Sequence, residues 1–191
     1  MKLSKVKPVC TKAESIQLIA PKIPENMITQ WVGAKNIAFY SIPKIHLTPA
    51  ELGALWDINA DKLLGFVTDK SMDWLEPSLA RVPAMADQEA AERKIKAYDF
   101  GSYYVLVNEQ DKKVFLLDAT YVKPCVDPKS SVYFVELPDF DMMSSWIGVY
   151  SDGVLMAVVE SEPDDVVSNM IGCIKSIVKT YDAQFDFSEE N

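Results

Sequence analysis

Two closely spaced carboxylates are the first residues of this sequence that could do chemistry. Asp139 and Asp141 stand two positions apart in Pro-Asp-Phe-Asp-Met-Met-Ser-Ser at 138–145. Paired carboxylates can hold Mg²⁺ or act as general acid and base, so a metal-dependent hydrolase or nuclease is one function to weigh. The spacing fits no calcium-binding loop, and a solvated acidic surface is the favoured interpretation. We therefore expect no catalytic residues, no metal and no cofactor.

Nucleophile and zinc chemistry find little support. His46 is the only histidine, and the three cysteines, Cys10, Cys125 and Cys173, are far apart in sequence. No nucleophile elbow occurs, and the spacing matches no zinc motif. The seven glycines form no phosphate-binding loop. An odd number of separated cysteines indicates reduced thiols, which is typical of a cytoplasmic protein.

Two further motifs have structural explanations. The tripeptide Asp99-Phe100-Gly101 matches a kinase metal-binding motif, but it lacks the other kinase signatures. We interpret it as chance and expect Gly101 to end a helix or begin a strand. Residues 48–67 have the apolar spacing of a helix-turn-helix, which raises the alternative of a transcription-linked protein. Six acids against two lysines between 46 and 76 would repel phosphates, so a plain helical hairpin is favoured.

The segment 138–145 is the best-motivated contact site. A connection between strands usually runs over the surface, yet this one carries Phe140, Met142 and Met143. Flexible thioethers beside an aromatic ring suit an adaptable binding surface. The alternative, which the sequence favours, is that these side chains fold back over one end of the core. Trp74 is the tryptophan most expected to be partly exposed.

Composition predicts one acidic domain over 1–191. The chain of 191 residues has a formal charge of −9, a pI near 4.6 and 49% hydrophobic residues. Such acidity disfavours nucleic acid as a partner. Neither a signal peptide nor a transmembrane run is recognised, so we expect a cytoplasmic protein away from membranes. Residues 1–14 read as a basic N-terminal arm and 182–191 as an acidic, frayed tail.

Residue periodicity predicts an α+β fold, with an antiparallel or mixed sheet of about five to seven strands and about four helices. The strongest unit is a hairpin at 146–150 and 154–159, followed by an amphipathic helix over 164–179. Other expected strands are 15–20, 37–42, 103–107, 114–117 and 132–137. Other expected helices are 24–32, 48–56, 60–67 and 87–98.

One hairpin resembles a known family. Gly101-Ser-Tyr-Tyr-Val-Leu106 through Val114-Phe-Leu-Leu-Asp118 is similar to the central hairpin of the SUKH immunity-protein superfamily. The likeness is confined to this hairpin, so no function is carried over from it. Acidity, a full core and the missing catalytic pattern favour a non-enzymatic protein–protein interaction module. An adaptor, inhibitor or immunity-type accessory protein of a bacterium or phage fits this description. The partner would be another protein, and self-association into a homo-oligomer stays open.

Overall fold

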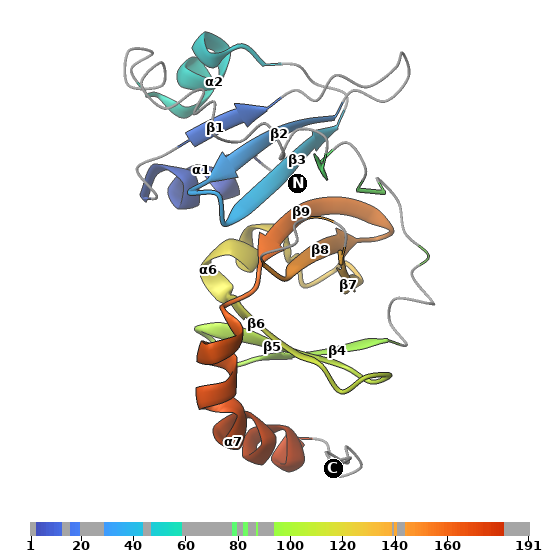
Figure 1. Cartoon of the computed structure of the whole chain (residues 1–191). Coiled ribbons are helices and arrows are strands. Elements are labelled where there is room, and N and C mark those ends of the chain that lie inside the picture. The colour runs from blue at the N-terminus through green and yellow to red at the C-terminus, as the bar shows by residue number, and fades with distance from the viewer. Residues whose placement is uncertain are drawn as a thin grey trace.

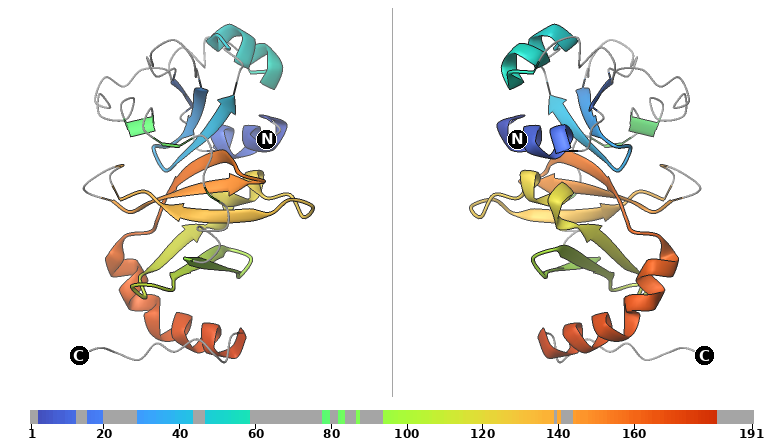
Figure 2. Two further views of the ribbon diagram at one scale, coloured as in Figure 1. Left: turned by 90° about the vertical axis from the view of Figure 1, so that its right-hand side faces the viewer. Right: turned by 90° about the vertical axis from the view of Figure 1, so that its left-hand side faces the viewer.

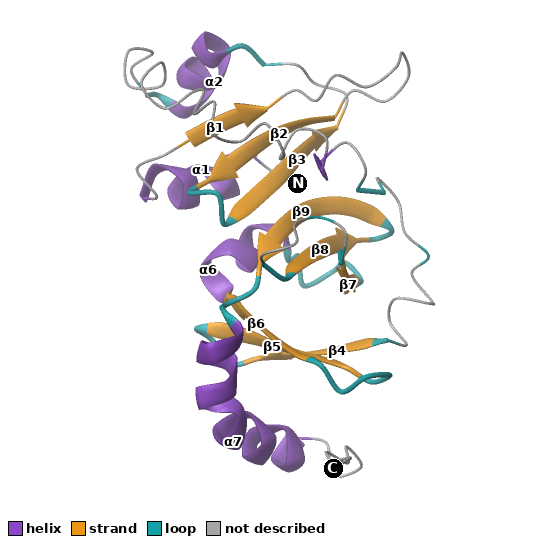
Figure 3. Cartoon of the chain, in the orientation of Figure 1, coloured by secondary structure: helices purple, strands orange, loops and turns teal. Residues whose placement is uncertain are grey.

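The chain forms an α+β structure with two antiparallel sheets (Figures 1 and 3). The computed structural model describes residues 3–12, 16–19, 29–43, 47–58, 78–79, 82–83, 87, 94–138, 140 and 144–181. In these residues, one sheet has six strands and the other has three. The larger sheet confirms the expected strand number, while the second sheet was not anticipated.

The six-stranded sheet has the order β1-β2-β3-β9-β8-β7. Its strands are β1 Ile16–Ile19, β2 Thr29–Ala34, β3 Ala38–Pro43, β7 Val132–Glu136, β8 Trp146–Ser151 and β9 Val154–Glu160. The expected hairpin is thus β8–β9, with Gly153 at φ 83° in its turn. This is a backbone conformation that glycine adopts without strain. β9 pairs with β3, so the middle of the sheet joins segments that lie far apart in sequence.

The three-stranded sheet consists of β4 Ile95–Asp99, β5 Tyr103–Asn108 and β6 Val114–Asp118. The hairpin expected at 103–107 and 114–117 is β5–β6. The short helix α6, Ala119–Val122, and the 3₁₀ turn η2, Lys123–Cys125, follow it and lead to β7. Gly101, at φ 80°, lies in the turn between β4 and β5 rather than at a helix end.

The two sheets bury three apolar clusters, because strand side chains alternate between the faces of a sheet. One face of the six-stranded sheet, with Val32, Tyr40 and Val149, shares a core with Leu106 and Phe115 of the small sheet. Figure 2 shows the small sheet below β7–β9, with α1 and α6 beside the larger sheet. The opposite face carries a ring-rich cluster, and the outer face of the small sheet forms a third cluster.

Two helices follow their sequence signals closely. In α2, Pro49–Trp56, the Thr48 side chain caps the first turn and Glu51 completes a capping box. Helix α7, Asp164–Tyr181, begins with two aspartates at its positive end. Its Val167 and Met170 pack on the outer face of the small sheet.

The helix predicted over 24–32 is wrong where the structure describes it. Residues 29–34 form β2, between β1 and β3. Trp31 and Val32 are both buried, in clusters on opposite faces of the sheet. Apolar residues that follow one another suit a strand covered on both sides, and this continuous run was taken for one side of a helix.

Two other predictions need correction. The helix expected at 87–98 gives way to β4, because Ile95–Asp99 pair along β5 and this pairing overrides the helix preference of Lys96 and Ala97. The expected arm at 1–14 contains helix α1, Leu3–Lys12, whose Val6 and Cys10 are buried in the core shared by the sheets. The helix expected at 60–67 and the tail at 182–191 lie outside the described residues.

Candidate functional site

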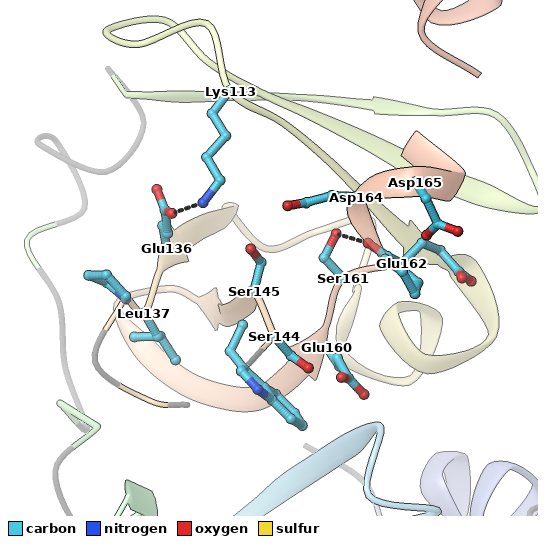
Figure 4. Close-up of a pocket in the computed structure, with 13 residues that line it drawn as sticks. Lys113, Glu136, Leu137, Ser144, Ser145, Glu160, Ser161, Glu162, Asp164 and Asp165 are labelled. Carbon is cyan, nitrogen blue, oxygen red and sulfur yellow. Dashed lines mark hydrogen bonds and ion pairs between the residues drawn. The ribbon is translucent and has the colours of Figure 1, made fainter. Parts of the chain in front are cut away.

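A cleft opens at the seam between the two sheets, where β9 leaves the larger sheet and α7 begins (Figure 4). Its volume is about 560 Å³. The residues that line it come from the start of β6, the ends of β7 and β9, the segment before β8 and the first turn of α7. They are Lys113, Glu136, Leu137, Pro138, Ser144, Ser145, Trp146, Glu160, Ser161, Glu162, Pro163, Asp164 and Asp165.

Hydrogen bonds fix the floor of this cleft, which we call the acidic cleft. The N–H of Ser161 donates to Ser145 O at 2.8 Å. The N–H of Leu116 donates to Ser161 Oγ at 3.1 Å, and the N–H of Glu162 donates to Leu116 O at 2.8 Å. The segment 161–162 is therefore hydrogen-bonded to Ser145, which precedes β8, and to Leu116 of β6. These bonds link the two sheets beside the cleft.

Negative charge dominates the lining. Five of the lining residues carry carboxylates, Glu136, Glu160, Glu162, Asp164 and Asp165, and Lys113 is the single lysine among them. In Figure 4 the Lys113 side chain reaches across from the small sheet to Glu136. Their Nζ–Oε1 distance is 2.7 Å, and the same ammonium group lies 4.8 Å from the centre of the Phe115 ring. This lysine therefore already neutralises one of the five acids.

Among the remaining acids, Glu162 is the one whose charge is disfavoured by its surroundings. The pKa of Glu162 is raised above its ordinary value by partial burial, and also by the negative charges of Asp118 and Glu160. Like charges in a partly desolvated site disfavour the ionised form. A cationic group entering the cleft would relieve this repulsion, so the site is suited electrostatically to lysine or arginine side chains.

The hydroxyl group and the possible metal ligands of the cleft decide what chemistry its described residues could support. Ser161 is the buried serine of the cleft, and its hydroxyl is engaged with the backbone of Leu116 and Glu162. Across the part of the chain that the structure describes, no group of three or more His, Cys, Asp or Glu side chains is placed to hold a metal ion.

The predicted contact residues divide into two groups. Phe140 is 5% exposed and packs against Trp146, with ring centroids 4.8 Å apart. Its ring thus covers the core, which is the alternative that the sequence favoured, and it is not offered to a partner. Trp74, Met142, Met143, Asp139, Asp141 and His46 lie outside the described residues. The ends of the predicted loop, Pro138 and Ser144, border the acidic cleft.

Sequence reasoning missed the acidic cleft itself. Glu160, Glu162, Asp164 and Asp165 fall within six consecutive positions, and this density of acids was a usable signal. The two aspartates are also expected at the positive end of a helix dipole, which explains them without a site. Glu136 and Lys113 could not have been added from sequence, because they join the cleft through the packing of one sheet on the other.

A second cleft of about 410 Å³ lies between α1, η2 and the β8–β9 hairpin, with Lys5, Asp127 and Cys125 among its lining residues. Burial raises the pKa of the Cys125 thiol to about 12. Burial has the same effect on Cys10, whose pKa is also raised to about 12. Because the thiolate is the reactive form, neither cysteine is a candidate nucleophile.

The helix-turn-helix candidate is described only in its first half. In α2, Leu52 and Trp56 are buried in the core, whereas Leu55 is 58% exposed. Asp57 ends the helix in the left-handed conformation, at φ 52°. The would-be recognition helix lies outside the described residues, so the helix-turn-helix interpretation stays a prediction.

The comparisons with known proteins add no relative: no family model, no curated protein and no solved structure matches this chain. Within the described ranges, no helix is both long and apolar enough to cross a membrane.

Proposed function

We propose that this chain is a non-enzymatic protein-binding module and that its contact surface is the acidic cleft with the 138–145 segment at its border. The observation that carries the proposal is the lining of the cleft, which includes five acidic residues and one lysine. The partner is a protein that presents a basic surface. Charge complementarity of this kind selects the partner and speeds the encounter.

The position of the cleft supports the same function. It lies where two sheets and the start of a helix meet, so rigid elements hold most of its lining residues. A rigid surface loses little conformational entropy on binding. Met142 and Met143, which the sequence predicts to be contact residues, belong to the segment 138–145. Their adaptable side chains would add apolar contact area. An adaptor or inhibitor would use both features, the acidic lining held by strands and a helix and the adaptable side chains of the adjoining segment.

The proposal is tested with two charge-reversed variants. Glu160→Lys combined with Glu162→Lys changes the cleft, and Glu109→Lys combined with Asp127→Lys makes the same change in charge elsewhere. Both are compared with the wild type in quantitative capture of proteins from the native cell. We expect the captured partner to be retained by the wild type and by the control variant, and lost from the cleft variant.

Raised salt should weaken the same capture, because exposed charges are screened. Capture that is equal for the two variants would show that the acidic cleft is not the contact surface. Both variants must keep the wild-type melting temperature to within a few degrees for the comparison to hold, which circular dichroism checks.

A further inference from the structure

The outer strand of the small sheet, β4, pairs with β5 on one side and with no described strand on the other (Figure 1). The N–H of Glu109 donates to Lys94 O at 2.7 Å, and the N–H of Phe100 donates to Tyr103 O at 2.9 Å. Bonded pairs recur at every second residue of an antiparallel ladder, so the even-numbered residues of β4 bond to β5. The backbone groups of its odd-numbered residues, with Ala97 in the middle, therefore point away from β5.

Two other sheet edges differ from this one. At β6, Leu116 is already hydrogen-bonded to Ser161 and Glu162. At β7, the central residue Phe134 is buried. On β4, Ala97 is exposed, and among the described residues no hydrogen bond to its N–H or C=O is formed. Open backbone groups on an edge strand are a template for pairing with another strand.

The sequence along β4 is complementary to itself. It reads Lys94-Ile-Lys-Ala-Tyr-Asp-Phe100, so a lysine stands one and three residues before Ala97, and an aromatic ring one and three residues after it. In an antiparallel pair with Ala97 opposite Ala97 of a second copy, Lys96 lies opposite Tyr98 and Lys94 opposite Phe100. Two-fold symmetry makes each of these pairs occur twice.

These lysine–ring pairs favour association on the outer face of the small sheet, where Tyr98 and Phe100 adjoin the third cluster. A lysine stem packs along apolar surface while its ammonium group stays in water, and the ammonium group is attracted to a ring face. The Lys96 ammonium group lies 3.0 Å from Glu109 of its own chain, with 43% of the side chain exposed. Its stem is therefore accessible to a neighbouring strand.

Other registers of the same pairing are less favourable. A slip of one residue places outward backbone groups opposite inward ones, so the bonded pairs are lost. A slip of two residues in one direction places Lys96 opposite Lys96, and like charges directly opposite are destabilising. A slip of two residues in the other direction keeps Lys96 opposite Phe100 but takes Lys94 away from both rings. The register centred on Ala97 thus satisfies both the backbone and the side chains.

We propose that β4 is the contact between two copies of this chain, which pair antiparallel about Ala97 and join their small sheets into one. The smallest side chain of the strand stands at the two-fold axis, where it allows the backbones to approach. The acidic cleft borders β6, at the opposite edge of the small sheet. The contact therefore uses other residues than the proposed function does, and each can fail without the other.

The first test is Ala97→Pro. Proline lacks the N–H at the centre of the contact, and an edge strand tolerates it where the N–H faces outward. In sedimentation velocity, we expect the mass of the wild type to rise with concentration from 21.4 kDa, the mass of one chain, towards twice that value. The proline variant should keep the mass of one chain at every concentration, with a melting temperature close to that of the wild type.

Two cysteine variants, made in a Cys173→Ser background, test the register without proline. Ala97→Cys places two thiols at the axis, where the Cα atoms of a bonded pair lie about 5.5 Å apart, a separation that suits a disulfide. Ser102→Cys is the matched control. Ser102 is also exposed, but its two copies stand at opposite ends of the paired strands. Mild oxidation with copper–phenanthroline should turn most of the first variant and little of the second into covalent dimer.

Three outcomes overturn the inference. One is a wild type with the mass of a single chain at every concentration at which it stays soluble. Another is a folded Ala97→Pro variant that still dimerises, which would place the contact elsewhere. The third is equal cross-linking of the two cysteine variants, which would indicate random collision. If the proline variant does not fold, the cysteine pair decides the matter.

Discussion

The two faces of the six-stranded sheet are covered in different ways. One face carries mostly aliphatic side chains, and α1, α6 and the small sheet cover it. The other carries five aromatic rings, and its described cover from outside the sheet includes Leu79 and a sixth ring, that of Phe140. The difference is in the size of the side chains that the sheet itself supplies.

Large rings provide most of the burial that the described residues give this face. Trp146 lies between Phe39 and Phe140, with ring centroids 5.8 Å and 4.8 Å away. Tyr133 and Tyr150 are stacked at 5.4 Å. Aromatic residues bury the most area per side chain, so the rings that the sheet supplies and the ring of Phe140 bury much of this face against one another. The aliphatic face spreads its burial over many smaller contacts instead.

The largest predicted loss of stability comes from a substitution on the aromatic face, and a substitution on the aliphatic face is compared with it. Trp146→Ala should lower the free energy of unfolding by about 3–5 kcal/mol, because it removes the ring on which the aromatic cluster is centred. Ile147→Val, the next residue on the aliphatic face, should cost only about 0.5–1.5 kcal/mol. Urea unfolding measures both. Similar losses of unfolding free energy for the two variants would show that the burial energy of the aromatic face is no more concentrated in single side chains than that of the aliphatic face.

A smaller effect concerns one phenol on each face. Tyr150 Oη donates to Pro83 O at 2.9 Å, and Tyr40 Oη donates to Tyr121 O at 2.9 Å. Burial raises the pKa of Tyr150 to about 12, and burial also raises the pKa of Tyr40. Both phenols therefore stay neutral hydrogen-bond donors. Tyr150→Phe and Tyr40→Phe should each cost about 1 kcal/mol. A markedly larger loss for one variant would show that its bond fixes the cover of that face.

The contribution of Glu162, in the acidic cleft, to stability should change with pH in the opposite direction from that of a salt-bridged acid. The pKa of Glu162 is raised above 4.5, so the folded chain binds its proton more tightly than the unfolded chain does. Its charge therefore lowers stability at neutral pH, and this cost disappears as pH falls through the raised pKa. Glu162→Gln should melt higher than the wild type at pH 7 and merge with it below pH 4.5. A gap that persists in acid would contradict this cause.

Thiol reactivity should separate core from surface without changing stability. Cys10 and Cys125 are buried in the aliphatic core, whereas Cys173 on α7 is exposed. A disulfide reagent such as DTNB should modify one thiol per native chain and all three in denaturant. Cys173→Ser should remove the native reaction and leave the melting temperature unchanged. Rapid reaction of a second thiol would show that the core opens readily.

Local signals predicted the local structure. The β8–β9 hairpin, the capping box of α2 and the acidic start of α7 each follow from residues within a few positions of one another. The strand β2 did not, because Trp31 and Val32 bury opposite faces only when β1 and β3 lie beside them. β4 likewise depends on β5, whose pairing overrides the helix preference of Lys96 and Ala97.

The candidate site was predictable only in part. The acids at 160–165 are visible as a run, but their meeting with Glu136 and Lys113 depends on how two sheets pack. The prediction that Phe140 covers the core is confirmed, because its ring packs on that of Trp146. A ring in a short connection between two strands lies close enough to the end of the core to reach it. Met142, Met143 and Trp74 lie outside the described residues, so their expected contact role stays a prediction.

The pairing of β3 with β9 has a consequence for the order of events during synthesis. Ser41 Oγ donates to Leu155 O across 114 positions of sequence, and Phe39 pairs with Val158. A nascent chain cannot close the centre of its larger sheet until residue 160 has left the ribosome. Contacts of such high sequence separation slow folding, and the waiting edge of β3 is then open to aggregation. Cooperative folding of this protein should accordingly wait until β9 has been synthesised, and release of the β1–β3 meander alone should favour chaperone binding.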